Sequence, residues 1–211
     1  RLLQTNTDGI FVLCENEEMK NKVIEITHSV GKRLRMEFEI DEYTKLIQKD
    51  VNNYIAVQKN GKLECKGAMV KKNKPLDNNL SILNDAVRNY LAYGKPVEET
   101  INECDELIKF QNVIKLSSKY KEVWYGTAVK EKDDKGSFKV TKVNGELLKS
   151  KVHRVFASKN ECDGGIYKSK IEKGKKSYEQ FAGTPDHLFI ENGDIHNVKV
   201  PENLDKSFYI E

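Results

Sequence analysis

The sequence predicts an α+β fold in three parts: an antiparallel β portion with a helix in residues 1–76, a helical segment in 77–121, and a β-rich part in 122–211. Three observations predict it. Short apolar runs joined by Asp-Gly and Asn-Gly pairs indicate hairpins in the first part, because glycine accepts positive φ at little cost. Apolar residues at helical spacing fill the second part, and apolar–polar alternation with aromatic residues returns in the third.

The bulk composition bounds the class of protein without fixing its function. The chain has 211 residues, 36 Lys and Arg against 33 Asp and Glu, and a net charge of +3. This mild basicity permits nucleic-acid binding but does not demand it. No apolar run approaches the ~20 residues of a membrane span, and no signal peptide is visible, so we expect a cytoplasmic protein without a membrane partner. The chain opens directly on a strand, and we expect it to be a piece of a longer protein.

Cysteine usage adds one expectation about the compartment. The four cysteines are far apart and share no CxxC spacing; they are Cys14, Cys65, Cys104 and Cys162. Zinc sites need clustered ligand pairs, so the spacing disfavours such a site and predicts reduced thiols.

The first hairpin lies at the start of the chain. Two apolar runs, Leu2–Leu3 and Ile10–Leu13, flank a polar turn that ends in Asp8-Gly9. Acidic residues and an apolar face then predict a helix that ends near Gly31. Alternation over residues 34–40 predicts a half-buried strand after it.

A second hairpin is predicted around Asn60-Gly61, between short strands that contain Tyr54 and Lys66. Downstream, the spacing predicts one helix after Asn79 or Ser81, a second after Pro96, and a third short helix from Phe110 toward Ser118.

Strands follow in the third part of the chain. They are predicted at 123–126, at 138–142 before a turn at Asn144-Gly145, at 152–156 and at 165–168, and the lysine run at 173–176 is predicted to be a solvated loop.

The first hairpin resembles the palm hairpin of family B DNA polymerases, which carries Tyr-x-Asp-Thr-Asp-Ser between two strands. The matching residues are Thr5-Asn6-Thr7-Asp8-Gly9, with the family's first Asp at Asn6, its second at Asp8 and its Ser at Gly9. The resemblance implies that Asp8 is the catalytic Mg²⁺ ligand, and Asn6 leaves one fewer anionic ligand. Nucleotidyl transfer uses two Mg²⁺ ions to stabilise the attacking and leaving oxygens.

The resemblance continues through the second hairpin. The family has a Lys-Lys-x-Tyr motif that opens a strand, then a return strand that ends in Lys-Gly and a basic pair. Tyr54, Lys66-Gly67 and Lys71-Lys72 match in order, while Asn52 and Asn53 stand where basic residues are usual. By resemblance, Tyr54, Lys66, Lys71 and Lys72 bind the primer–template, and lysine contacts to phosphate supply affinity that is independent of sequence.

The resemblance therefore implies a function for each part. Residues 1–76 would be the C-terminal part of the palm, 77–121 a helical thumb segment, and 122–211 the β-rich C-terminal part of the thumb region, as in phage-type or plasmid-type members. The parent would be a monomeric DNA-directed DNA polymerase that acts in the cytoplasm, of the host if it is phage-encoded. It would use primer–template DNA, dNTP and Mg²⁺. The family's Asp-x-x-Ser-Leu-Tyr-Pro motif, which supplies the second carboxylate, is absent from this sequence, so we expect the isolated chain to be inactive.

Two other classes stay open at this stage. In the first, the chain is a non-catalytic nucleic-acid-binding module, and Asp8 only suits its turn. In the second, it is a structural interaction domain without a role on DNA. A basic groove beside Asp8 would favour nucleic-acid binding over the structural class.

Overall fold

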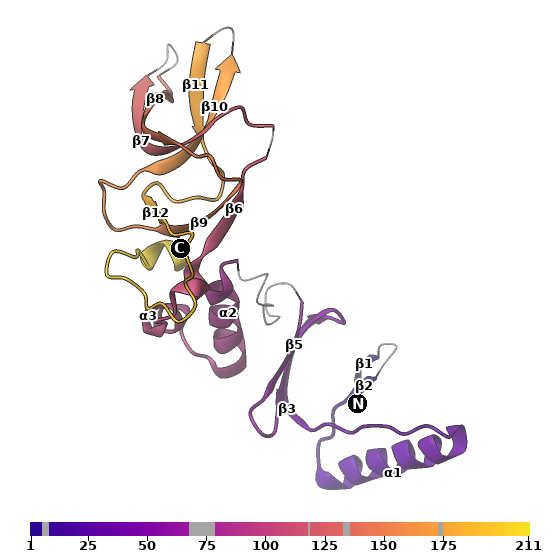
Figure 1. Cartoon of the computed structure of the whole chain (residues 1–211). Coiled ribbons are helices and arrows are strands. Elements are labelled where there is room, and N and C mark those ends of the chain that lie inside the picture. The colour runs from indigo at the N-terminus through magenta and orange to yellow at the C-terminus, as the bar shows by residue number, and fades with distance from the viewer. Residues whose placement is uncertain (6–8, 68–78, 118, 133–135, 173–174) are drawn as a thin grey trace. The chain divides into compact units, whose positions relative to one another are not determined.

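A computed structural model of the protein describes residues 1–5, 9–67, 79–117, 119–132, 136–172 and 175–211. The chain divides into two compact units: unit 1 comprises residues 1–72 and 90–94, and unit 2 comprises 73–89 and 95–211. Strands in every sheet pair antiparallel, and three α-helices accompany them in the described ranges, so the α+β prediction is confirmed. Figure 1 shows the elements in chain order.

Unit 1 contains a hairpin, a long helix and a three-stranded sheet. The hairpin pairs β1 (Leu2–Thr5) with β2 (Ile10–Val12). The helix is α1 (Glu17–Leu34), and the sheet has the order β3–β4–β5, with β3 at Tyr43–Asp50, β4 at Asn53–Gln58 and β5 at Leu63–Lys66. The predicted first hairpin and the predicted hairpin at Asn60-Gly61 are both confirmed, and Gly61 has the positive φ of 81° that its turn requires.

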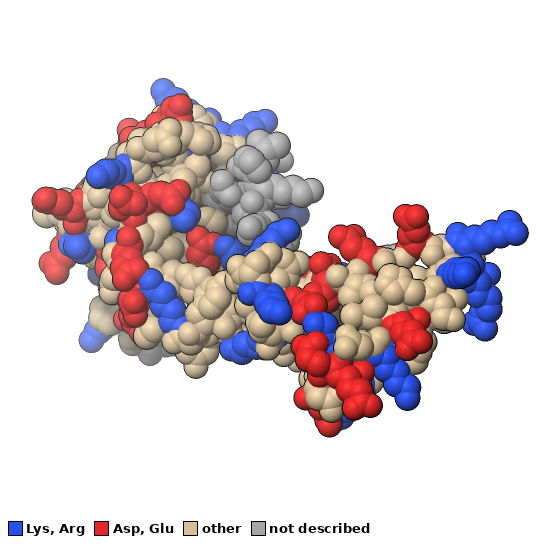
Figure 2. Space-filling model, turned by 90° about the horizontal axis from the view of Figure 1, so that it is seen from below, with Lys and Arg blue, Asp and Glu red and all other residues tan. Residues whose placement is uncertain are grey.

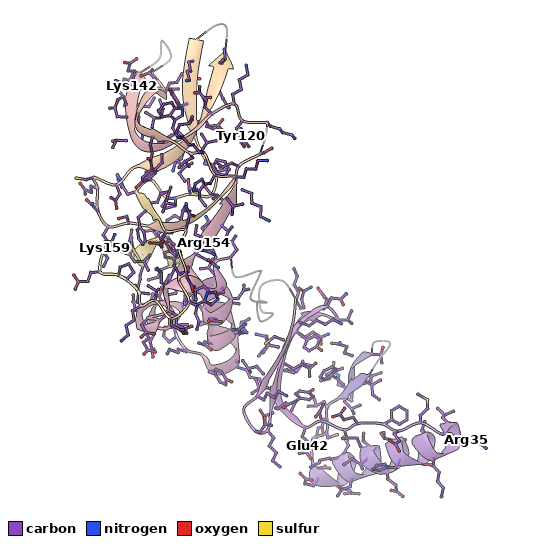
Figure 3. All side chains as sticks on the ribbon, in the orientation of Figure 1. Arg35, Glu42, Tyr120, Lys142, Arg154 and Lys159 are labelled. Carbon is purple, nitrogen blue, oxygen red and sulfur yellow. The ribbon has the colours of Figure 1, made fainter. Side chains whose placement is uncertain are left out.

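Helix α1 is set by its ends. The Asn16 side chain accepts a hydrogen bond from the Met19 backbone N–H at 2.8 Å, which satisfies one orphan donor of the first turn. The backbone of the C-cap residue Arg35 adopts the left-handed αL conformation, and Figure 3 shows this residue at the C-terminal end of the helix. The Met36 N–H then donates to the Gly31 carbonyl at 3.0 Å, which turns the chain back over Gly31.

The prediction of a half-buried strand over residues 34–40 is wrong. Leu34 is the last residue of α1, and no strand is assigned from Arg35 to Ile40, whose apolar side chains stay largely exposed. The alternation reflects a segment that folds back along the helix: a side chain at Gly31 would lie 2.7 Å from the Met36 carbonyl and 3.2 Å from the Phe38 ring. Apolar and polar residues therefore alternate here although the segment pairs with no described strand, and pairing is what defines a sheet.

Unit 2 joins short helices to two β-structures. Its helices are α2 (Ser81–Tyr93), whose last turn is counted with unit 1, α3 (Val97–Glu103), and the 3₁₀ turns η2 (Leu107–Phe110) and η3 (Ser207–Tyr209). A three-stranded sheet has the order β12–β9–β6, with β6 at Asn112–Lys115, β9 at Val152–Ala157 and β12 at Leu188–Ile190. Four further strands close into a barrel in the order β10–β11–β8–β7; they are β7 (Val123–Lys132), β8 (Phe138–Leu147), β10 (Gly165–Glu172) and β11 (Lys175–Gln180).

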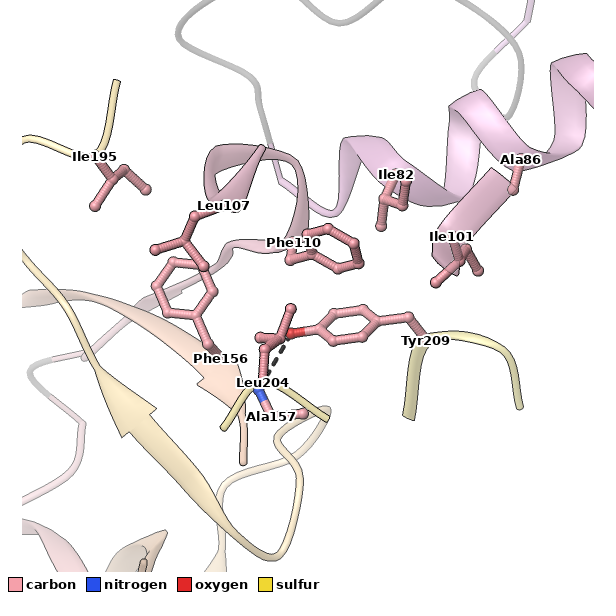
Figure 4. Packing of buried hydrophobic residues seen from close by; sticks show 10 residues of the cluster. All are labelled: Ile82, Ala86, Ile101, Leu107, Phe110, Phe156, Ala157, Ile195, Leu204 and Tyr209. Atoms are coloured by element: carbon pink, nitrogen blue, oxygen red, sulfur yellow. Dashed lines mark hydrogen bonds between the residues drawn. The ribbon is translucent and has the colours of Figure 1, made fainter. Parts of the chain in front are cut away.

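Two buried clusters hold unit 2 together. The first joins the helices to β9 and the C-terminal segment; Figure 4 shows Phe110, Phe156 and Tyr209 at its centre. The Ala157 N–H donates to the Tyr209 hydroxyl at 3.1 Å, so the one polar atom of that ring is satisfied. The second cluster packs barrel residues such as Ile166 against the sheet that contains Val155 and Leu188. The first cluster therefore joins the helical segment to the β-rich segment, although the sequence predicted them as separate parts.

Three local predictions in unit 2 are corrected. The expected third helix from Phe110 is a 3₁₀ turn followed by β6, because β-branched Val113 and Ile114 pair with β9. The expected turn at Asn144-Gly145 lies inside β8, where Gly145 is needed because a side chain there would lie 2.0 Å from the Tyr125 carbonyl oxygen. The lysine run is not a loop throughout, since Lys175 and Lys176 belong to β11 and residues 173–174 lie outside the described ranges.

Candidate nucleic-acid interface

The β1–β2 hairpin docks on the sheet of unit 1 through two side chains. The Phe11 ring lies 5.5 Å from the Tyr43 ring and 5.6 Å from the Tyr54 ring, measured between centroids. Gln4, which is directly opposite Phe11 in the hairpin, is buried and accepts a hydrogen bond from the Gln48 amide. Directly opposed residues point to one side of a β-pair, so one face of the hairpin is fixed against β3 and β4.

The described residues of the hairpin end on either side of the tip that contains Asp8. Thr5 and Ile10 form the last described pair before the tip, and Gly9 is the last described residue of the turn. Asp8 itself lies outside the described residues, together with Asn6. Its role as a catalytic Mg²⁺ ligand therefore stays a prediction.

Tyr54 lies on the sheet face that receives the hairpin. It is 7% exposed, and its hydroxyl donates to Glu64 Oε1 at 2.6 Å. The Tyr43 hydroxyl donates to the other oxygen of the same carboxylate. Burial, and then the hydrogen bond to Glu64, raise the pKa of Tyr54 to about 12, and the same two causes raise the pKa of Tyr43. In this structure the Tyr54 hydroxyl donates its proton to Glu64. Its contact with DNA stays a prediction.

Lys66 shares this face and is exposed. It is directly opposite Tyr54 in the β4–β5 register, and Glu64, two residues earlier, is opposite Ala56. Residues two apart on a strand share a face, so Tyr54, Glu64 and Lys66 all project on the side that holds Phe11 and Gln4. The side chain of Lys66 is thus available to a ligand beside the hairpin. The other two predicted DNA contacts, Lys71 and Lys72, lie outside the described residues.

Gly67 explains how β5 leaves the sheet. Its φ is +113°, and a side chain there would lie 2.5 Å from the Asn53 Oδ1 atom and 3.2 Å from its Cα. Only glycine fits a position with both constraints. The Lys66-Gly67 pair therefore combines an exposed cation with a close approach of two backbones.

Sequence reasoning missed two members of this arrangement. Phe11 was taken only as part of an apolar strand, and Glu64 was not singled out. A signal for Glu64 was present: it lies two residues before Lys66 in a strand that follows a well-marked turn, so the period of two places both on one face. The two tyrosines that bind its oxygens come from other strands, and no local pattern joins them to it.

Two properties of the described residues concern metal-binding clusters and membrane-spanning helices. Over these residues, no group of three or more His, Cys, Asp or Glu side chains could hold a metal ion. No helix in the same ranges has both the length and the apolar character to cross a bilayer. Figure 2 shows acidic and basic side chains interspersed on the face it presents, without a large area of one sign.

Comparisons with known proteins give no relatives. No family model, no curated protein and no solved structure matches this chain.

Proposed function

We propose that the chain is part of a template-directed DNA polymerase, in which the β1–β2 hairpin presents Asp8 to Mg²⁺ and the growing primer end. The sequence resemblance to family B polymerases motivates the proposal. One structural observation supports it most: the hairpin and Lys66 occupy the same face of the β3–β4–β5 sheet. A polymerase needs a carboxylate and phosphate contacts side by side, and the described strands of the hairpin share this face with Lys66.

The chain's own part in the reaction would be to position groups. The hairpin is held at Phe11 and Gln4, so its strands form a firm support for a carboxylate at the tip. Lys66 would contact a backbone phosphate without reading sequence. Mg²⁺, when bound, would stabilise charge on the attacking and leaving oxygens. By resemblance, Asp8 would be this chain's contribution to the site. The remaining ligands would come from elsewhere in the polymerase, because the motif that supplies the second carboxylate is absent from this sequence.

Replacement of the carboxylate in the full-length parent tests the proposal. We expect Asp8→Ala to reduce primer extension by about 10³-fold or more, because a metal ligand that acts in the transition state is lost. Asp41→Ala is the matched control, since Asp41 is an exposed aspartate of the same unit that the proposal gives no role, and it should keep a normal rate. A normal rate for Asp8→Ala would refute the catalytic assignment.

A non-catalytic nucleic-acid-binding module is the second candidate. The observation that favours it is the lysine-rich barrel of unit 2, which does not depend on Asp8. This candidate predicts that Asp8→Ala leaves both synthesis and DNA binding unchanged.

A further inference from the structure

The barrel of unit 2 concentrates positive charge. Its four strands carry twice as many lysines as glutamates and no arginine, aspartate or histidine, although the whole chain is only +3. The segment after the barrel, residues 181–211, carries more acidic than basic residues. The excess of lysine therefore belongs to the barrel strands themselves. A local concentration of one sign attracts a ligand of the opposite sign more strongly than net charge suggests.

Strand register collects part of this charge on one face. Lys130 is opposite Val140 and Lys132 is opposite Phe138 in the β7–β8 pair, and the bulge in this ribbon lies before them. Val140 is also opposite Tyr178 of β11, so these residues point to the same side. Two residues from Tyr178, Lys176 is opposite Ile171 of β10. We define the barrel-mouth face as six side chains that share this side: Lys130, Lys132, Phe138, Ile171, Lys176 and Tyr178.

Aromatic rings alternate with the lysines on this face. The Lys132 ammonium lies 5.5 Å from the centroid of Phe138. The Lys176 ammonium lies 5.5 Å from the ring of Tyr178 and 5.8 Å from that of Trp124, and it also pairs with Glu122. Trp124 points to the same side as Tyr167, its partner on β10, and so continues the face toward the barrel interior. These contacts show that cations and ring faces already meet here.

The outer part of the face is open. Phe138 is 67% exposed and Ile171 is 63% exposed, and Lys130 and Lys132 are exposed as well. Figure 1 shows β7, β8, β10 and β11 rising together at one end of unit 2, away from its helices. An exposed ring beside Lys130 and Lys132 offers an anionic ligand with an aromatic group both a stacking surface and cations.

We propose that the barrel-mouth face binds single-stranded nucleic acid. Lys130 and Lys132 would contact backbone phosphates, and Phe138 would stack on a base. Stacking needs a base with a free face, which a single strand offers and a duplex hides, so the exposed ring favours the single strand. The proposal uses no residue of unit 1 and stands independently of the role of Asp8.

Fluorescence anisotropy of the whole chain with a labelled oligothymidylate tests the proposal. Lys130→Gln/Lys132→Gln should weaken binding at least about fivefold and reduce the salt dependence, because each phosphate contact contributes a slope of about 0.7 for a single strand. The matched control is Lys139→Gln/Lys142→Gln on the same ribbon. Lys139 is opposite Glu131 and Lys142 is opposite Val129, on the other face, and Figure 3 marks Lys142 on β8. This control should change affinity less than about twofold.

The ring has its own pair of variants. Phe138→Ala should weaken binding of the oligothymidylate at least about fivefold through lost stacking, whereas Phe138→Tyr should retain it. Val129→Ala removes an exposed apolar side chain from the opposite face and should have no effect. All these side chains are exposed, and thermal melting should show that each variant stays folded.

Several results would overturn the proposal. They are undetectable binding of the oligothymidylate at low salt, equal losses in the two lysine double variants, or an unchanged affinity in Phe138→Ala. Equal weakening of single-strand and duplex binding by Phe138→Ala would also contradict it, because stacking on a free base would then not explain the loss. Lys66→Gln distinguishes this proposal from the proposed function, because it removes a predicted DNA contact of unit 1 and leaves the barrel-mouth face intact.

Discussion

The two units differ in how much apolar surface they bury. In unit 2, the side chains of Phe110, Phe156, Ile166 and Leu188 are at most 1% exposed and belong to two clusters. Unit 1 buries mainly one strand, β4, while Ile10, Met36 and other large apolar residues are more than half exposed. The stability of unit 2 thus rests on cores, and that of unit 1 rests on one buried strand with a ring contact to its hairpin.

This difference separates stability from the proposed chemistry. Asp8 and Lys66 belong to the unit with the thinner core, and the barrel-mouth face belongs to the unit with two. Substitutions at sites that share no partner act nearly independently, so we expect separate effects from a change in the clusters of unit 2 and a change at the hairpin of unit 1. The single tryptophan, Trp124, lies in unit 2, so its fluorescence reports the unfolding of that unit.

The largest effect is expected in the core of unit 2. Phe110 is fully buried, and its ring contacts that of Tyr209 at 5.1 Å between centroids. Phe110→Ala should reduce the free energy of unfolding by about 3–5 kcal/mol, because it leaves a cavity in a packed cluster. Urea unfolding followed by Trp124 fluorescence measures this change. The Phe208 ring also contacts Tyr209 but is partly exposed. Phe208→Ala should therefore reduce the free energy of unfolding by only about 1 kcal/mol.

A smaller effect is expected where the hairpin meets the sheet of unit 1. Phe11→Ala removes two ring contacts of a half-buried side chain and should cost about 2 kcal/mol. Hydrogen exchange should become faster in β1 and β2, while the Trp124 transition stays unchanged. Ile10→Ala, at an exposed neighbour, should leave both measurements within error. Unaltered exchange in Phe11→Ala would show that the rings do not hold the hairpin.

The smallest effect concerns the titration of Tyr54. Its pKa in the folded state, about 12, is raised above the ordinary value of 10.0 by burial and then by Glu64. The folded state therefore retains this proton when the unfolded state has lost it. The resulting stabilisation is complete below about pH 10 and is lost as the pH rises through 12.

Tyrosinate absorbance at high pH measures this shift. Glu64→Gln removes the negative partner and should lower the pKa of Tyr54, which burial still keeps above its ordinary value. Comparison of the wild-type titration with that of Tyr54→Phe identifies which absorbance step belongs to Tyr54. An identical titration in the wild-type chain and Glu64→Gln would contradict the assigned cause.

The local sequence predicted the elements whose signals are local. The acidic first turn of α1 and the turn at Asn60-Gly61 lie within a few residues of the helix and the hairpin that they determine. The face shared by Tyr54 and Lys66 also follows from strand alternation once the turn is known. The α+β class and the locations of β7, β8, β9 and β10 could also be predicted from local alternation.

The misses occur where distant segments decide the structure. Residues 112–115 form a strand because β9 is available some forty residues later, and Gly145 lies mid-strand because β7 approaches it closely. The barrel-mouth face combines residues of β7, β8, β10 and β11, whose alignment depends on barrel closure. Secondary-structure propensity depends only on residues that are close in sequence, so strand pairing with a distant segment can override it.

Single-nucleotide addition by the full-length parent, with the affinity for primer–template measured beside it, tests the central claim most directly. Asp8→Ala should lower the rate at saturating DNA by about 10³-fold or more and leave DNA affinity nearly unchanged, because the lost carboxylate acts in the transition state. Lys66→Gln should do the reverse: it should weaken DNA binding and its salt dependence while the saturated rate stays close to normal. A normal rate in Asp8→Ala, or an unaltered DNA affinity in Lys66→Gln, would contradict a hairpin and sheet face that act together on a primer end.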